Sequence, residues 1–307
     1  MDQAQIQQVR SFNRAVTQRI GVLSDDYLSR GRPLGESRLL FEIGRNGADL
    51  RDLRERLSLD SGYLSRMLRS LEAQGLVASQ RAADDGRVRR AVLTRKGLRE
   101  FDALDRHSQD FATSLLASLD AAQRERMVAA MAEVERLMRA SAVTIEPADP
   151  ASADARLCIE AYLRELEQRF ESGFDPARSV SANPEELVPP AGLFLLAHLD
   201  GRPVGCGGLK TTGRKLGEIK RMWVAPDARG LGIAQRLLEA LEQHAVRMNL
   251  DTLQLDTNRT LKEAHALYVR NGYREIARYN DNPYADHWFE KRGLKRAVGA
   301  MGAVGAA

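Results

Sequence analysis

Two glycines between a predicted strand and a predicted helix are the first candidate for chemistry in this chain. The segment Arg229-Gly-Leu-Gly-Ile-Ala234 follows the run 218–224 and leads into a helix predicted over 233–248. A helix N-terminus directs unpaired N–H groups and the positive end of its dipole at one point, where a pyrophosphate can bind. Because Gly230 and Gly232 lack a Cβ, an anion can approach the backbone there closely. We expect a phosphate-bearing ligand at this turn.

A second candidate site lies in residues 47–94, where the pattern predicts a helix-turn-helix followed by a basic hairpin. The helix predicted over 61–74 buries four apolar side chains and presents an outward face of hydroxyl and guanidinium groups: Ser61, Tyr63, Ser65, Arg66 and Arg69. Such groups read base edges in the major groove. The predicted hairpin turns at Asp85-Gly86, and Arg87 and Arg89 follow the turn, where arginine suits phosphate or minor-groove contact.

Charge is distributed unevenly along the 307 residues. Residues 1–143 hold 24 Lys and Arg against 20 Asp and Glu, whereas residues 61–99 alone hold 9 against 3. The rest of the chain holds 22 of each sign and is neutral. This local excess indicates double-stranded DNA as a partner, with a solvated basic face as the alternative.

Composition limits the class of protein. The chain is 43% hydrophobic and 29% charged, which is typical of a globular protein long enough for two domains. No apolar run approaches the roughly 18–20 residues that cross a bilayer, so we expect no membrane partner. The N-terminus does not resemble a signal peptide, and Cys158 and Cys206 match no metal or redox spacing. We therefore expect buried thiols, a cytoplasmic protein and no metal, since the five histidines form no ligand cluster in the sequence.

The elements divide into two groups. Residues 1–142 are predicted to be mainly helical, with long helices over 5–30, 95–118 and 121–139 around the helix-turn-helix. Residues 143–292 alternate between strands and helices. Strands are predicted over 142–146, 193–198, 204–209, 218–224, 253–257 and 287–291, and helices over 154–170, 233–248 and 261–270. Residues 293–307 are rich in Gly and Ala, and we expect a disordered tail there.

The first half resembles the MarR family of winged-helix regulators over about residues 5–140. The segments that carry the resemblance are Leu64-Ser-Arg-Met-Leu-Arg-Ser-Leu-Glu-Ala-Gln-Gly-Leu76 and Asp85-Gly-Arg87. The resemblance implies that Ser61–Arg69 enter the major groove, that Arg87 lies at the wing tip, and that the long helices form a homodimer on an inverted-repeat operator. The segment Leu34-Gly-Glu-Ser-Arg38 departs from the family's usual Leu-Thr-x-x-Gln opening, so the ligand pocket of ordinary members is not carried over.

The second half resembles the GNAT acyltransferase family over about residues 143–292. The glycine turn, Leu253-Gln-Leu-Asp-Thr257 and Ala264-His-Ala-Leu-Tyr-Val-Arg-Asn-Gly-Tyr273 carry this resemblance. It implies an α/β fold with a mixed, mostly antiparallel sheet, and acetyl-CoA as cosubstrate. The implied cofactor-binding residues are Met222, Trp223, Val224, Arg229, Gly230, Leu231, Gly232, Ile233, Ala234 and Asn258.

Catalytic roles follow from the same resemblance. Tyr268 matches the general acid that protonates the departing thiolate, although a tyrosine that only covers the sheet edge would have the same spacing. An amine must lose a proton to attack, and Glu218 is the candidate base; the alternative is a surface glutamate paired with Lys220 or Arg236. Tyr273 and His265 are expected to be structural, and the loop 170–176 is expected to border the acceptor pocket.

Three functional hypotheses remain at this stage. The first is a bifunctional protein, a DNA-binding transcriptional regulator that is also an acetyl-CoA-dependent N-acetyltransferase acting on a small amine or a protein lysine. In the second, the GNAT-like domain is a sensor that binds acetyl-CoA or a metabolite without turnover. In the third, the protein is an acetyltransferase whose winged helix only dimerises.

Overall fold

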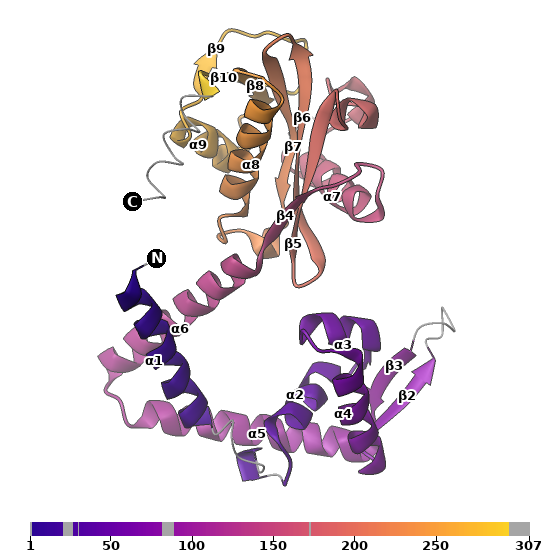
Figure 1. Ribbon diagram of the computed structural model, residues 1–307, viewed down its shortest axis with the longest axis vertical. Coiled ribbons are helices and arrows are strands. Elements are labelled where there is room, and N and C mark those ends of the chain that lie inside the picture. The colour runs from indigo at the N-terminus through magenta and orange to yellow at the C-terminus, as the bar shows by residue number, and fades with distance from the viewer. Residues whose placement is uncertain (1, 21–26, 30, 82–88, 172, 295–307) are drawn as a thin grey trace. The chain divides into compact units, whose positions relative to one another are not determined.

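The computed structural model describes residues 2–20, 27–29, 31–81, 89–171 and 173–294 (Figure 1). It divides into two compact units, Met1–Ala130 and Met131–Ala307. The division falls inside helix α6 (Ala121–Ala142), whereas the sequence placed the domain boundary after it, at residue 142. The end of α6 belongs to the second unit because Arg236 donates hydrogen bonds to the carbonyl oxygens of Ala140 and Val143, at 2.9 and 2.8 Å.

The first unit contains the predicted helix-turn-helix, formed by α3 (Leu50–Arg56) and α4 (Ser61–Ala73) and preceded by α2 (Leu34–Ile43). Asp60 caps α4 by accepting a hydrogen bond from the Tyr63 amide at 2.8 Å. Apolar residues at spacings of three and four make one buried stripe on α4, as predicted: Leu64, Met67, Leu68 and Leu71. Opposite this stripe the helix is exposed.

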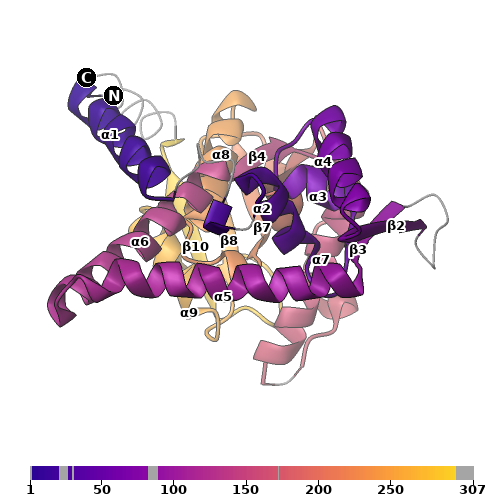
Figure 2. The same ribbon diagram turned by 90° about the horizontal axis from the view of Figure 1, so that it is seen from below.

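The hairpin after α4 forms from β2 (Val77–Arg81) and β3 (Arg89–Leu93), as the sequence predicts. Figure 2 shows its two strands beyond the end of the long helix α5 (Arg95–Ala117). A two-residue strand, β1 (Ala48–Asp49), pairs with β3 and was not predicted, because two residues leave no periodicity to detect. The hairpin tip, 82–88, lies outside the described residues, and with it the prediction for Arg87.

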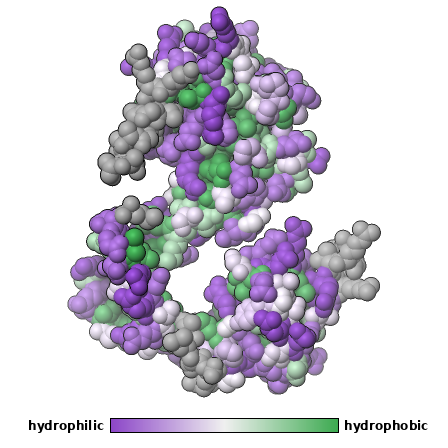
Figure 3. Space-filling model, in the orientation of Figure 1, coloured by the Kyte–Doolittle hydropathy of each residue, from purple (hydrophilic) through white to green (hydrophobic). Residues whose placement is uncertain are grey.

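Two long helices, α1 (Gln3–Ile20) of the first unit and α6, which spans the division between the units, keep apolar side chains exposed. Helix α1 is shorter than the predicted helix over 5–30, and a separate 3-10 turn, η1 (Tyr27–Ser29), follows the undescribed residues 21–26. No described residue of α1 or α6 is buried; Val9 is 58% exposed and Val128 51%. Apolar residues are visible at the surface in this region (Figure 3).

A seven-stranded sheet organises the second unit, in the order β4-β5-β6-β7-β8-β10-β9. The strands are β4 (Thr144–Pro147), β5 (Gly192–Leu199), β6 (Arg202–Gly213), β7 (Leu216–Val224), β8 (Thr252–Thr257), β9 (Arg274–Ile276) and β10 (His287–Arg292). Every neighbouring pair is antiparallel except β7 and β8. The predicted mixed, mostly antiparallel sheet is confirmed, with β9 as a short strand that the sequence did not predict.

Helices cover both faces of this sheet. They are α7 (Ala153–Arg169), α8 (Ile233–Arg247) and α9 (Lys262–Arg270), with 3-10 turns η2 (Pro176–Arg178), η3 (Pro184–Leu187) and η4 (Pro226–Ala228). Side chains alternate across a strand, so successive residues of β5 enter different cores. Leu193 and Leu195 pack in the cluster with α8, whereas Phe194 and Leu196 pack in the cluster with α7. Hence β5 is a continuous apolar run.

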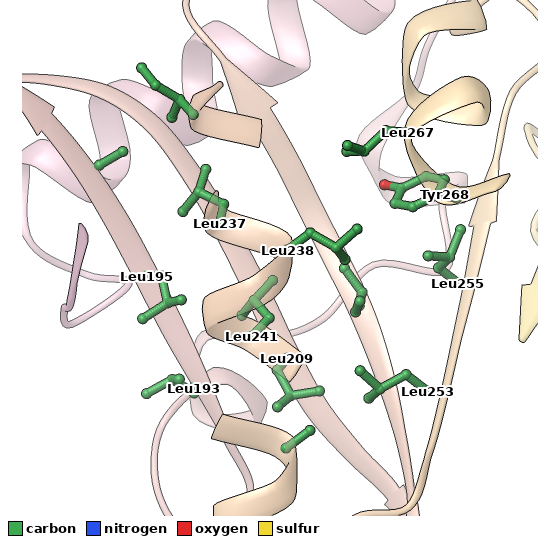
Figure 4. Packing of buried hydrophobic residues seen from close by; sticks show 14 of the residues in the cluster. Leu193, Leu195, Leu209, Leu237, Leu238, Leu241, Leu253, Leu255, Leu267 and Tyr268 are labelled. Atoms are coloured by element: carbon green, nitrogen blue, oxygen red, sulfur yellow. The ribbon is translucent and has the colours of Figure 1, made fainter. Parts of the chain in front are cut away.

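The main core lies between α8, α9 and the sheet, and Figure 4 shows its leucines together with Tyr268. It extends past the predicted end of the domain, because Leu294 is fully buried in it. The remainder of the predicted tail, 295–307, lies outside the described residues. Cys158 and Cys206 are buried free thiols, as predicted. In the described ranges, no helix combines the length and apolar character that crossing a membrane requires.

Candidate functional site

Strands β7 and β8 separate partway along their length and open a cleft in the second unit. Their parallel pairing covers Leu216–Glu218 of β7 and stops at the pair Glu218 and Gln254. The glycine turn, the start of α8 and the side of α9 surround the opening. This loop cleft, about 1250 Å³ and open to solvent, is lined by Tyr162, Glu165, Met222, Trp223, Val224, Arg229, Gly230, Gly232, Ile233, Ala234 and Tyr268, among others.

The glycine turn has the geometry of an anion site. Gly230 and Gly232 have φ of 80° and 75°, a left-handed backbone that favours glycine. A Cβ built on either one would meet no atom within 4 Å, so this side of the turn is open. Gly232 caps α8 without a side-chain hydrogen bond. Among the described residues, no acceptor meets the amides of 230–232. The positive end of α8 is thus available to an anion.

The Arg229 side chain holds the turn in place. Its guanidinium donates to both carboxylate oxygens of Glu165, at 2.7 and 2.6 Å, and to the Val224 carbonyl oxygen at 3.1 Å. Glu165 also accepts from Trp223 Nε1 at 2.8 Å. Burial alone would raise the pKa of Glu165, but hydrogen bonds from Arg229, Trp223 and Arg169 hold this pKa below its ordinary value. The carboxylate is therefore charged and fixes the end of β7 to the turn. The sequence analysis missed Glu165, since a glutamate on a helix is not by itself a motif.

Tyr268 lies where the loop cleft meets a second pocket. The aromatic pocket, about 750 Å³ and open to solvent, is lined by Phe170, Phe174, Tyr284, Lys220, Arg221, Asp256 and Asn258, among others. Tyr162, Met222 and Tyr268 line both spaces, so the two adjoin. Phe170 and Phe174 confirm that the loop 170–176 borders a pocket here.

The Tyr268 ring is fixed in the core and only 5% exposed. It packs edge-on against Tyr273 at 5.8 Å, beside Leu255 and Leu267 (Figure 4). Burial, and then the negative charge of Asp256, raise the pKa of Tyr268 above its ordinary value. The phenol therefore keeps its proton at neutral pH, as a general acid must.

Most of the predicted cofactor residues gather around the loop cleft. Leu231 is the exception within the turn, because its side chain is buried in the main core. Asn258 lines the aromatic pocket, and its side chain is already engaged: it donates to the Tyr284 carbonyl oxygen at 2.7 Å and accepts from the Thr260 amide at 2.9 Å. Tyr273 packs in the core as predicted.

Glu218 is not among the residues that line these two pockets, although its neighbours Ile219 and Lys220 line the aromatic pocket, and its role as the base stays a prediction. It is 4% exposed and pairs with Lys220 at 2.8 Å, while the Tyr279 hydroxyl donates to it at 2.7 Å. The alternative pairing with Lys220 is therefore confirmed, in a buried rather than a surface position. Burial would lower the pKa of Lys220, but Asp256 and Glu218 together raise it. Asp256 is the carboxylate that lines the aromatic pocket.

Two of the five histidines come together with a glutamate at the edge of the sheet, although the sequence itself shows no ligand cluster. Nitrogen atoms of His265 and His287 and a carboxylate oxygen of Glu275 all lie within 4.8 Å of one another. His287 Nδ1 and Glu275 Oε1 are 2.7 Å apart. Such a group has the donor types of a divalent-cation site. Sequence spacing could not reveal it, because each residue comes from a different element.

In the first unit, all five predicted DNA-contacting residues of α4 are exposed. The Arg66 guanidinium stacks over the Tyr63 ring at 5.5 Å, and Arg69 donates to the Ser65 carbonyl oxygen at 3.2 Å. Arg89 is exposed at the start of β3. Its neighbour Arg90 instead donates to the Asn46 carbonyl oxygen at 2.7 Å and so holds β3 to the preceding turn.

Comparisons with known proteins match the two units separately. A model described as the acetyltransferase (GNAT) family matches residues 159–273, and one of the MarR family matches residues 30–88. An aminoalkylphosphonate N-acetyltransferase of Salmonella typhimurium is 32% identical over 133 residues, which are 41% of this chain and 80% of that protein.

Two further relatives match shorter segments. An IAA acetyltransferase of Azospirillum brasilense is 40% identical over 90 residues, 29% of this chain and 59% of that protein. An uncharacterized HTH-type transcriptional regulator of Bacillus subtilis is 26% identical over 83 residues, 27% of this chain and 51% of that protein. The chain thus spans only a little over half the length of these two relatives.

Proposed function

Because the chain belongs to the GNAT acetyltransferase family and carries a MarR-family region, we propose that it is a bifunctional protein. In this proposal it is an acetyl-CoA-dependent N-acetyltransferase of a primary amine and a DNA-binding transcriptional regulator. One observation carries the enzymatic part: the protonated Tyr268 phenol stands on the wall shared by the open glycine cleft and a second pocket. This arrangement places an acid between a cofactor site and an acceptor site.

The cofactor would enter through its phosphates. The pyrophosphate of acetyl-CoA would accept hydrogen bonds from the amides of the turn, Arg229, Gly230, Leu231, Gly232, Ile233 and Ala234. The pantetheine arm would follow the end of β7 along Met222, Trp223 and Val224, which line the same cleft. Beyond Glu218 this strand has no pairing to β8, so it can bind the arm as a further strand. The role of Asn258 toward the cofactor stays a prediction.

The reaction would then be a direct transfer. The amine nitrogen attacks the thioester carbonyl, a β7 amide stabilises the oxyanion, the new N–C bond forms and the C–S bond breaks. Tyr268 gives its proton to the departing thiolate. The proton lost by the amine passes to a base, and Asp256 is the carboxylate available in the aromatic pocket. Glu218, which the sequence predicts as the base, contacts Lys220, and Lys220 in turn contacts Asp256.

The acceptor is an amine in this proposal, either a small molecule or a protein lysine. The name of the Salmonella relative describes an acceptor that carries an amino group, which supports this class. Catalysis needs no metal in this scheme, because the acid and the base are protein side chains.

For the first unit, we propose a cytoplasmic homodimer that binds an inverted-repeat operator. The exposed apolar faces of α1 and α6 support dimerisation, since such faces mark contact surfaces in soluble proteins. The exposed hydroxyl and guanidinium groups of α4 support major-groove contact, and exposed Arg89 on the hairpin supports a further contact. The DNA contact of Arg87 stays a prediction.

A test separates the enzyme from the sensor that was its alternative. The protein is incubated with acetyl-CoA and a panel of primary amines, free thiol is measured, and acetylated products are identified by mass spectrometry. Amine-dependent thiol release with a matching product supports the enzyme. Calorimetric binding of acetyl-CoA without any product would support the sensor. A gel shift on the protein's own promoter tests the regulator, and its absence would leave the winged helix as a dimerisation module.

A further inference from the structure

Arg221 brings to the aromatic pocket a positive charge that no described carboxylate pairs. Three charged side chains of the described residues line this pocket, and two of them, Lys220 and Asp256, pair with each other at 3.0 Å. Arg221 instead donates from Nη2 to the Ala182 carbonyl oxygen at 2.7 Å and to Ser181 Oγ at 3.4 Å. A partly buried cation costs free energy unless an anion meets it. The unpaired positive charge of Arg221 therefore favours the binding of a negatively charged group in this pocket.

Arg221 lies at a β-bulge of β7 and has a strained backbone conformation. Cys206 faces Trp223 and Gly208 faces Lys220, so Gly207 alone faces two residues, Arg221 and Met222. At this bulge Arg221 has a φ of 55°, in the left-handed region that disfavours any residue with a Cβ. Glycine would fit the bulge without strain. An arginine held in a strained backbone beside a pocket indicates a role for its side chain.

The surroundings of Arg221 describe its ligand. Its Nη2 is held by the segment 181–182, whereas its buried Nε has no hydrogen-bond partner among the described residues. The rings of Phe170, Phe174 and Tyr284 line the same pocket, with centroids 4.9–5.8 Å apart. An occupant that satisfies both features carries an anion at one end and an apolar body against the rings.

We propose that Arg221 binds a carboxylate or phosphonate of the acetyl acceptor, which is then a small amino acid or aminophosphonate with an apolar side chain. This inference rests on the proposed acetyltransferase function. A guanidinium matches either anion through paired hydrogen bonds. A protein lysine has no such anion near its amine, so the proposal selects the small-molecule class of acceptor.

The first experiment uses the unmodified protein loaded with CoA. Calorimetry compares glycine, leucine and phenylalanine with the amines that lack only their carboxylate, and with the corresponding aminophosphonates. We expect one acid at least to bind roughly 10- to 100-fold more tightly than its neutral counterpart, the range of one charge-assisted hydrogen bond. Carboxylates and phosphonates are ranked by the same titrations. Equal affinities within every pair would overturn the proposal.

The second experiment changes the arginine. Arg221→Met should remove the preference for the acid and leave the affinity for the neutral amine within about twofold. Arg221→Lys keeps a positive charge and should therefore retain part of the preference for the acid. Arg214→Met is the matched control, because Arg214 is exposed in the turn between β6 and β7 and lines neither pocket. If Arg221→Met does not fold, the titrations of Arg221→Lys and of the unmodified protein test the proposal.

Thiol release is measured on the same samples. An acid that binds through Arg221 without thiol release would contradict the enzyme and keep the anion site. Thiol release that is as fast with neutral amines as with acids would support the enzyme and contradict the anion site at Arg221.

Discussion

The replacement of Tyr268 by phenylalanine tests the chemistry most directly. The substitution removes one oxygen atom and keeps the ring that packs against Tyr273 and Phe289. No described residue hydrogen-bonds to the Tyr268 hydroxyl, so its removal leaves no buried partner unsatisfied. We therefore expect the free energy of unfolding to change by less than about 1 kcal/mol. Any large loss of activity must then come from the missing proton.

The size of that loss follows from the role assigned. A positioned general acid contributes roughly 10²- to 10⁴-fold to a rate, so kcat should fall by at least about 100-fold. The affinity for CoA, measured by calorimetry, should stay within about threefold, because the phosphate contacts of the glycine turn are untouched.

The dependence of kcat on pH gives a second test of the role of Tyr268. Catalysis needs the protonated phenol, and burial together with Asp256 raises the pKa of Tyr268 above its ordinary value near 10. The unmodified enzyme should therefore keep its acid form throughout pH 7–10, and a fall of kcat due to this group should begin only above about pH 10. A fall assigned to Tyr268 below pH 9 would contradict the structure.

Tyr273→Phe is the matched control, since it removes the same atom from a buried tyrosine that lines neither pocket. It should leave kcat within about threefold. The reasoning fails if Tyr268→Phe keeps normal turnover, or if both variants lose activity equally, because the ring packing rather than the hydroxyl would then matter.

Three further predictions address the turn, the DNA and the metal. Gly232→Ala should weaken CoA binding by roughly tenfold, since its φ of 75° strains alanine and the new methyl group enters the open side of the turn. Gly272→Ala, at a φ of 82° and with equally open surroundings, is the control. Equal CoA affinities of the two variants would count against the anion site. Arg66→Ala should weaken DNA binding in a gel shift by roughly tenfold, whereas Arg106→Ala on α5 should not; equal effects would point to net charge alone. EDTA should leave kcat unchanged, and a loss restored by Zn²⁺ would show that His265, Glu275 and His287 hold a required metal.

The order of elements was predictable because it depends on local signals. Apolar periodicity and turn residues located every long helix and strand of the second unit to within a few residues, for example α8 and β8. The elements that the sequence did not predict are those that are very short or that depend on pairing with a strand elsewhere in the chain. Strands β1 and β9 have two and three residues, and they exist only because β3 and β10 offer edges for pairing.

The candidate site divides along the same line. The glycine turn and Tyr268 could be predicted, because each lies in a contiguous pattern with a strand or helix of known type beside it. Glu165 could not, since its importance depends on Arg229 and Trp223, which are about sixty residues away in the chain. The role of Glu218 as a base stays a prediction, since its partners Lys220 and Tyr279 come beside it only in the folded chain.

The position of the pocket follows from two irregularities in one strand. Pairing of β7 with β8 ends at Glu218, and the bulge opposite Gly207 begins at Arg221. The first leaves the end of β7 unpaired on one edge, and the second brings Arg221 and Met222 to the pocket walls. Lys220, one residue before the bulge, contacts both Glu218 and Asp256, so two salt bridges fix the strand where its backbone pairing stops.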